Sequence, residues 1–581
     1  MTALAARPGA GTGTGSPHVA EAAMLGRQTR HELVSLVRTP VTLILSIGLP
    51  LLFFVLLSAL IGNEVLDTVQ GVRLVQFLAP GMASFGVVMA TFSFLAVGLA
   101  EARATGVVKR QAGTPVPRWV LVGGRVCAAL VLGLVATALV LVTGVLFYGL
   151  VLPGRSMVAV LVTLLVASAS FSALGLALAT ALPTMQLTLA VSNGVVIPLA
   201  FVSDMFMVGA QMPPALSTLG WIFPLKHLTA IFADALNPYL AGSGFQAGHL
   251  AVIALWGLLG AVVATALLRR DRDRSTARGR RAADATGAHA DAKVGAHVGA
   301  RARRRAADAV PRRSGSPSVV ELLVDQLRHA QALLWRDASA VFFAVAFPVV
   351  LVAIIPSVNG GGDRLMASGL ALGTFYAGTM AVYGAAVTAY VNMPQGLAED
   401  RERGVLKRTG GTPLPAAALV TGRVAGAVGV ALVTGLAIAV LTALAYRPAW
   451  PPGLAAAVLT LVVATVCFAV VGQAVMTFVR SAQAVIGVTL GTLLPLAFVS
   501  DIFVVGAKFP TVLEWVSWIF PLRHASAAMT EALAPDVTGT GLAFGHLGVL
   551  VAWTAVAAVV LSRRFRWEAR ESGHTARTSR R

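Results

Sequence analysis

The chain of 581 residues is 57% hydrophobic and only 12% charged, and its mean hydropathy is +0.80. These values exclude a soluble globular domain. The repeated apolar runs of about 20 residues have the length that a helix needs to cross a bilayer. Alternating barrel-strand patterns are absent, and a backbone in lipid must satisfy its own hydrogen bonds, so we predict an all-α polytopic membrane protein.

The net charge of +20 gives no reason to expect a nucleic-acid partner. The arginines are concentrated in particular loops and tails, as expected for the cytoplasmic segments of a membrane protein. The two cysteines, Cys127 and Cys467, both fall in apolar runs, and no residues have the spacing of metal ligands. We therefore expect two small core residues rather than a disulfide, and no metal site.

The N-terminal segment carries charge ahead of the first apolar run. Residues 1–20 are rich in Gly, Ala, Thr and Pro and are expected to be disordered. Residues 21–38 mix charged and apolar positions and could form an amphipathic helix on the inner membrane surface, or a frayed charged lead-in. Thr39 and Pro40 suit the N-cap and first turn of a helix. The first apolar run begins near Val41, too late for a secretory signal, so we expect the N-terminus to remain inside.

Six apolar spans follow in the first half, and a basic linker separates them from the second half. The segment at about residues 208–248, between the fifth and sixth spans, is too apolar for an ordinary solvated loop. The linker, residues 269–317, holds 14 Lys/Arg and 5 Asp, so its net charge is 14 − 5 = +9. We expect a disordered cytoplasmic connector whose arginines can touch anionic lipid. The expected spans are residues 41–62, 77–99, 118–148, 156–181, 187–207 and 249–268.

The second half repeats the first, which is the strongest signal in the sequence. Arg38 matches Arg336 at an offset of 298 residues, and Asp204 matches Asp501 at an offset of 297. An even number of spans in each copy gives both copies the same orientation, so the repeat is parallel. The spans expected in the second copy are residues 340–358, 370–396, 415–446, 453–478, 484–505 and 546–562.

The domain organisation predicted from this repeat is two six-helix units, about twelve spans in all, with both termini cytoplasmic. The first unit covers residues 21–268 and the second covers residues 318–562. The basic linker joins them, and a basic cytoplasmic tail follows at residues 563–581.

Two charged loops stand at the same place in the two units, between the second and third spans. Residues 101–117 and 399–415 agree at 10 of 17 positions. Glu399 and Arg403 are four residues apart, as are Arg403 and Lys407, so on a helix the first pair attracts and the second repels. We expect a short helix that ends near Gly410, with the following Thr-Pro capping the next span. A plain anchor of positive charge would need only the Lys and Arg residues.

These shared residues are therefore candidates for a specific docking role. In the first loop they are Glu101, Arg103, Gly106, Lys109 and Arg110; in the second they are Glu399, Arg401, Arg403, Gly404, Lys407 and Arg408.

A second repeated feature follows the fifth span at the outer side. Asp204 and Asp501 stand where the chain should leave lipid, so each could be an N-cap or turn residue, or contact a substrate. The sequence W-I-F-P-L-K/R-H then suits a segment that enters the outer leaflet and returns. Its histidines could sense pH, bind a metal or form a structural hydrogen bond. The members of this motif are Trp221, Pro224, Lys226 and His227 in the first unit and Trp518, Pro521, Arg523 and His524 in the second.

The pattern E-x-R-x-x-G-x-x-K-R-x-x-G-T-P after a second span resembles the corresponding loop of ABC-2 type exporter permeases, in particular those of the daunorubicin-resistance and multidrug type. The resemblance covers each half almost completely, and it implies that this loop is a coupling helix that docks on an ATPase subunit. It also implies a six-helix fold with an amphipathic N-terminal helix and an external re-entrant segment. Most members are single six-span chains that dimerise, whereas two units are fused here.

The loops of the two units differ inside the resemblance. Thr105 stands where the second loop has Arg403, and Ala102 stands where it has Asp400. The two docking sites therefore need not be equal.

The chain is not expected to hydrolyse ATP, because the phosphate-loop pattern G-x-x-x-x-G-K-[ST] does not occur in it. ATP and Mg²⁺ would belong to a separate ATPase subunit, present in two copies. The expected function is a permease in a bacterial plasma membrane that exports a small hydrophobic drug, natural product or lipid-like compound.

Two alternatives remain open from the sequence. One is a secondary transporter of the major-facilitator kind with two parallel six-helix halves, although the spans carry few ionisable residues for a proton relay. The other is a membrane-embedded enzyme, for which Asp204 and His227 are the only candidates for reactive groups.

Overall fold

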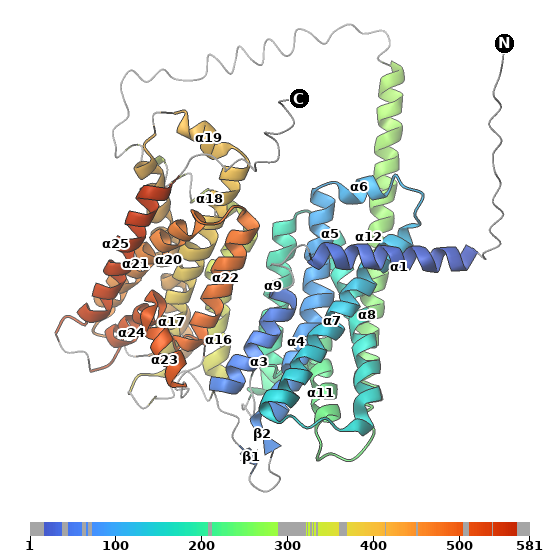
Figure 1. The fold of residues 1–581 in the computed structure, drawn as a ribbon, viewed down its shortest axis with the longest axis horizontal. Helices are drawn as coiled ribbons and strands as arrows, with labels where there is room; N and C mark the ends of the chain where they lie inside the picture. The colour runs from blue at the N-terminus through green and yellow to red at the C-terminus, as the bar shows by residue number, and fades with distance from the viewer. Residues whose placement is uncertain are drawn as a thin grey trace.

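The computed structural model shows an almost wholly helical chain in two halves that lie side by side (Figure 1). Each half has its own hydrophobic core. The fold class predicted from the repeated apolar runs is therefore confirmed. The structure describes residues 17–37, 44–60, 65–67, 72–206, 212–288, 321, 324–325, 328, 331–332, 335–359, 366, 369–412, 414–448, 451–503, 510–536 and 539–565.

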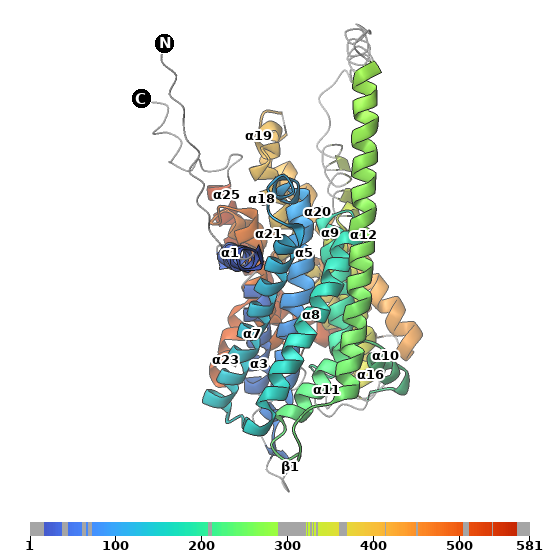
Figure 2. The ribbon, with the colours of Figure 1, turned by 90° about the vertical axis from the view of Figure 1, so that its right-hand side faces the viewer.

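The first half is a bundle of long apolar helices, with one surface helix lying across it (Figures 1 and 2). Its elements are α1 (Pro17–Val37), η1 (Ile44–Gly48), α3 (Leu49–Leu60), β1 (Val65–Asp67), β2 (Val72–Arg73), α4 (Leu74–Val88), η2 (Met89–Phe94), α5 (Leu95–Ala104), α6 (Val107–Gln111), α7 (Arg118–Tyr148), η3 (Gly154–Ser156), α8 (Met157–Ala181), α9 (Met185–Val202), α10 (Pro214–Ile222), α11 (Pro224–Leu236) and α12 (Ala247–Ala288).

The second half repeats this order of helices. Its elements are α15 (Ala338–Val341), η4 (Phe342–Ala346), α16 (Phe347–Val358), α17 (Leu372–Ala386), η5 (Val387–Asn392), α18 (Met393–Glu402), α19 (Val405–Gly410), α20 (Ala416–Tyr446), α21 (Leu454–Met476), α22 (Ala482–Val499), α23 (Thr511–Ile519), α24 (Pro521–Ala532) and α25 (Phe544–Arg564).

The two ends of the bundle are chemically different. The end with α6 and α19 carries the twin loops and is called here the charged-loop end. The opposite end carries the antiparallel β1–β2 hairpin together with α11 and α24, and is called the hairpin end (Figure 1). Surface helix α1 lies near the charged-loop end and packs against α7.

Within the described residues, ten helices are long and apolar enough to cross a membrane. They correspond to ten of the predicted spans, and α7 covers the predicted range 118–148. The other two predicted spans are helical as well. One is the shorter apolar stretch 46–59, and the other is the continuous run of α17, η5 and α18 over residues 372–402.

The basic linker and the N-terminal segment, which were both expected to be disordered, are helical over part of their length. Helix α12 continues to Ala288, twenty residues into the predicted linker, and α1 begins at Pro17 rather than after residue 20. The membrane-spanning part of α12 is already helical, so extending it carries no nucleation cost. Ala and Arg, which are common in the linker, are good helix formers, and the helix therefore continues beyond the span. The remaining residues of both segments, the proposed Thr39-Pro40 cap and the tail after residue 565 lie outside the described part.

Helices α8 and α12 pack closely because two glycines leave room for a backbone. A Cβ on Gly257 would lie 2.7 Å from the Cα of Ser170, and one on Gly260 would lie 2.8 Å from the backbone nitrogen of Leu174. Small residues at helix interfaces in membranes allow this kind of approach. The α8–α12 contact therefore depends on both positions remaining glycine.

Aromatic rings form a continuous contact at the boundary between the halves. The ring centroids of Phe53 and Phe498 are 4.8 Å apart, and Phe498 contacts Phe503 at 5.0 Å. On either side of these rings lie Phe206, 5.6 Å from Phe53, and Tyr383, 5.0 Å from Phe503. The boundary is completed by α9, which packs against α15, η4 and α16.

We predict that Gly260→Ala lowers stability in detergent by about 1–3 kcal/mol, because the added methyl group would overpack against the backbone of α8. Gly248→Ala on the same helix is the matched control, since no atom lies within 4 Å of the Cβ that it adds. Thermal unfolding of the purified chain, followed by size-exclusion chromatography, measures both. Equal midpoints for the two variants would contradict this packing.

Candidate functional site

The second charged loop is a helix, a glycine and another helix. Helix α18 ends at Glu402, Gly404 adopts φ 69° and ψ 14°, and α19 begins at Val405. This left-handed conformation favours glycine, because a Cβ would meet the neighbouring carbonyl. The chain therefore turns sharply at Gly404, and α19 projects from the bundle at the charged-loop end (Figure 1).

The first loop has the same backbone. Helix α5 ends at Ala104, Gly106 adopts φ 73° and ψ 9°, and α6 follows over residues 107–111. The acid and base residues of the two loops lie on these helices in equivalent places. Glu101 and Arg103 are on α5, and Lys109 and Arg110 are on α6; Glu399 and Arg401 are on α18, Arg403 caps it, and Lys407 and Arg408 are on α19.

The predicted attraction between Glu399 and Arg403 is confirmed, since their side chains form an ion pair at 3.0 Å. The predicted repulsion between Arg403 and Lys407 is wrong as stated, because Gly404 breaks the helix between them. The predicted end of the short helix near Gly410 agrees with α19.

The threonines do not cap the next span as expected. The Thr114 hydroxyl donates to the carbonyl of Gln111 at 2.6 Å, and Thr412 donates to the carbonyl of Thr409 at 2.5 Å. Both therefore close the preceding short helix. The next spans start after Pro117 and Pro415, which occupy the N-cap positions. Each proline holds the residue before it, Val116 or Leu414, out of the helical region, so the span cannot begin earlier.

One arginine in each loop anchors it to the charged-loop end of the fourth span. Arg103 donates to the carbonyl of Ala179 at 2.5 Å, and Arg401 donates to the carbonyl of Val479 at 2.8 Å. Ala179 is in the last turn of α8, where carbonyls have no partner inside the helix and carry partial negative charge, so an arginine is a suitable partner. Val479 lies three residues beyond the end of α21, in the connection to α22. Each loop is thereby attached to the place where the fourth span of its own half ends.

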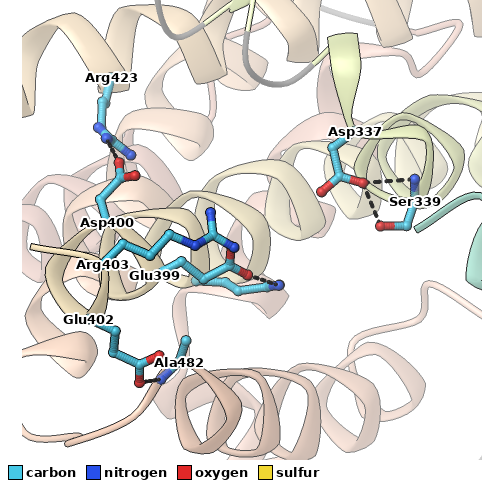
Figure 3. A network of polar contacts seen from close by, with 9 residues as sticks. Asp337, Ser339, Glu399, Asp400, Glu402, Arg403, Arg423 and Ala482 are labelled. Atoms are coloured by element: carbon cyan, nitrogen blue, oxygen red, sulfur yellow. Dashed lines mark hydrogen bonds and ion pairs between the residues drawn. The ribbon is translucent and has the colours of Figure 1, made fainter. Parts of the chain in front are cut away.

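The second loop has further polar contacts, which Figure 3 shows together. Asp400 forms an ion pair with Arg423 of α20, and Glu402 accepts a 2.8 Å hydrogen bond from the backbone of Ala482 at the start of α22. Leu406 of α19 is buried in a small apolar cluster with residues of α18, α20, α21 and α22. The second loop is thus held against three spans besides its own.

At the hairpin end, each half carries an ion pair whose cation is largely buried. Asp204 has φ 58° and lies 2.7 Å from Lys226, whose side chain is only 8% exposed. Asp501 has φ 54° and pairs with Arg523. Burial raises the pKa of the Asp501 carboxyl above its ordinary value, while Arg523 opposes this shift. Both aspartates are turn residues; the N-cap alternative is wrong, because the next helices are capped by prolines.

Each copy of the repeated W-I-F-P-L motif lies where two short helices meet, with the proline at the start of the second, so Pro224 opens α11 and Pro521 opens α24. The cation of the ion pair also lies over the indole, at 5.3 Å for Lys226 and Trp221 and at 4.9 Å for Arg523 and Trp518. This arrangement gives each buried cation a carboxylate and an aromatic face.

The sequence analysis missed a histidine pair in each half. Nδ1 of His227 is 2.6 Å from Nδ1 of His249, and Nδ1 of His524 is 3.0 Å from that of His546. The sequence feature that could have indicated these pairs is that His249 and His546 occupy matching positions in the two copies. In the first pair, Nε2 of His227 donates to the carbonyl of Trp221 at 2.9 Å. These contacts fit the structural hydrogen-bonding role, and the described residues contain no group of three potential metal ligands.

The family model for ABC-2 type transporters matches residues 26–236 and 326–533, one segment in each half. The chain belongs to the ABC-2 type transporter family. It contains two fused permease units of this family and is a multi-pass integral membrane protein, the transport component that works with an ABC ATPase. This assignment favours a transport permease over the major-facilitator and membrane-enzyme alternatives that the sequence had left open. A search of curated proteins found no match.

We predict that Gly404→Ala loosens the second loop by about 1–2 kcal/mol, because alanine is strained at positive φ. Gly404→Asn should cost less, since asparagine tolerates this conformation better than other non-glycine residues. Gly411→Ala is the control, because Gly411 has an ordinary φ of −82°. Hydrogen exchange over residues 393–412 measures the loosening. The same exchange rate in Gly404→Ala and wild type would count against this reason for glycine.

A double-mutant cycle tests the buried ion pair. Asp204→Asn leaves the Lys226 ammonium without its carboxylate, and we expect a loss of about 1–2 kcal/mol, reduced from the cost for a fully buried pair by the 45% exposure of Asp204. Adding Lys226→Met should recover much of this loss. Thermal unfolding of the wild type, the two single variants and the double variant gives the coupling free energy between the two side chains. Additive effects would show that the pair contributes nothing.

Proposed function

We propose that this permease exports a small hydrophobic compound, such as a drug, natural product or lipid-like molecule, and is driven by two copies of a separate ABC ATPase. One observation carries the proposal. Two charged helix–glycine–helix loops, built alike in the two halves, project at the same end of the bundle (Figure 1). A pair of soluble subunits can dock on such a pair of loops.

The residues proposed to form the two docking sites are those that the loops share or expose. They are Glu101, Arg103, Gly106, Lys109 and Arg110 in the first loop and Glu399, Arg401, Arg403, Gly404, Lys407 and Arg408 in the second. ATP and Mg²⁺ bind the partner subunits in this proposal, and the chain itself needs no cofactor.

The charged-loop end is proposed to face the cytoplasm of a bacterial cell, with both termini on that side and the protein in the plasma membrane. Basic residues support this orientation: α25 ends there in Arg563 and Arg564, and α12 carries Arg269 and Arg270. Trp221 and Trp518 at the hairpin end are each about two-fifths exposed, which suits the opposite membrane interface and an outer re-entrant segment.

The aromatic boundary between the halves supports an apolar cargo. Phe53, Phe498 and Phe503 supply rings from both halves along the surface where the halves would separate. Nucleotide-driven closure of the ATPase pair would press on the two loops. Arg103 and Arg401 would pass the movement to the fourth spans, as a rigid-body change between the halves.

We predict that Glu101→Ala/Glu399→Ala lowers ATP-coupled transport by about tenfold or more, a change of the size expected when coupling between two sites is lost. The assay uses proteoliposomes that hold the chain and the ATPase that co-purifies with it, and it follows a fluorescent hydrophobic compound. Arg563→Ala removes an exposed charge at the same end and serves as the control. Unchanged transport in the double variant would make the docking assignment wrong.

A further inference from the structure

The same arginine has different partners in the two halves. Arg125 of α7 and Arg423 of α20 occupy equivalent positions, and both side chains are 13% exposed. Arg125 pairs with Glu32 of the surface helix α1 at 3.2 Å. Arg423 pairs instead with Asp400 of the second charged loop.

The sequence shows that this is a reciprocal exchange. At the offset of 298 residues, Ala330 stands where the first copy has Glu32, and Ala102 stands where the second copy has Asp400. Each copy therefore has one carboxylate for this arginine, placed on a different element. An ion pair this poorly exposed holds its geometry better than one on the surface, because water screens it less.

The arginine anchor is common to both loops, but two further contacts of the second loop are missing from the first by sequence. Glu402, which holds the start of α22, is replaced by Ala104, and Arg403, which pairs with Glu399, is replaced by Thr105. Leu406 is 1% exposed in its apolar cluster, whereas α6 of the first loop has no buried residue. The second loop is therefore seated more firmly.

In the first half the close contact is between α1 and α7. A Cβ on Gly124 would lie 3.0 Å from the Cβ of Gln28, and one on Gly123 would lie 3.1 Å from Leu25. Arg125 reaches the first loop through a 3.5 Å contact from its Nη2 to Gln111. Helices α1 and α7 thus form one unit, and the contact from Arg125 of this unit to the first loop is long and goes to an uncharged amide.

We propose that the two loops are unlike docking sites for the ATPase. The second loop is the rigid site, through which the ATPase moves α20 and α22 directly. The first is a compliant site, and α7 is positioned by α1 instead. The inference rests on the proposed function for the identity of the partner, and it predicts that an ATPase pair uses the two loops unequally.

Hydrogen exchange of the full chain in lipid nanodiscs tests the asymmetry without any partner. Arg423→Gln should raise exchange over residues 393–411. Arg125→Gln should raise exchange mainly over residues 17–37 and change residues 95–112 much less. If Arg125→Gln loosens the first loop as strongly as Arg423→Gln loosens the second, the asymmetry is wrong.

Moving the carboxylate in the first half to the position that it has in the second is a test that does not depend on a loss of stability. Glu32→Ala/Ala102→Asp gives the first half the arrangement of the second and should protect residues 95–112 from exchange. Glu32→Ala alone is its matched control and should not protect them. Absence of protection in the double variant would also contradict the proposed role of Asp400.

The claim that the ATPase uses the two loops unequally is tested with the ATPase that co-purifies with the wild-type chain. Arg423→Gln should lower permease-stimulated ATP hydrolysis by about tenfold, and Arg125→Gln by less than about threefold. Equal losses would overturn unequal use of the loops. If the wild-type chain retains no ATPase, the docking claim fails together with the proposed function, whereas the exchange experiment still decides whether the two loops differ in rigidity.

Discussion

Inside an apolar bundle, backbone polar groups have to be satisfied within helices and charged groups have to be moved to the ends. The rest of this structure depends on that constraint. Several charged side chains near the ends have partners: Arg103 and Arg401 donate to carbonyls where the fourth spans end, and Lys226 pairs with Asp204. The two ends of the bundle therefore hold the chemistry, and the spans between them supply packing.

The two ends have diverged to different extents since the duplication. At the hairpin end the halves keep the same ion pair, histidine pair and indole contact, from Asp204–Lys226 to Asp501–Arg523. At the charged-loop end the partner of the shared arginine has changed from Glu32 to Asp400. In a symmetric dimer of identical chains both sites would change together. Fusion into one chain removes that restriction and allows each loop its own contacts.

Much of the fold was predictable because it follows from local pattern and from the repeat. The run that became α7 has clear proline and glycine boundaries, and Glu399 and Arg403 have the spacing of a helical ion pair. The loop glycine was found as a shared residue, although the break that it makes in the helix was not. The Thr-Pro caps were misplaced because a second proline two residues later delays the next helix.

The remaining contacts join distant parts of the chain. Glu32 and Arg125 are 93 residues apart, and no periodicity connects them. His227 and His249 are 22 residues apart on different helices, so only their repetition as His524 and His546 hinted at a pair. The helical continuation of α12 to Ala288 was missed because composition alone does not show that a preceding span has already nucleated the helix.

The most direct test of this account is to purify the tagged chain from its native membrane and to identify what comes with it. The account predicts a soluble protein in stoichiometric amount that carries the phosphate-binding pattern G-x-x-x-x-G-K-[ST]. A chain that is purified alone, and that catalyses proton-dependent flux in liposomes without ATP, would contradict it.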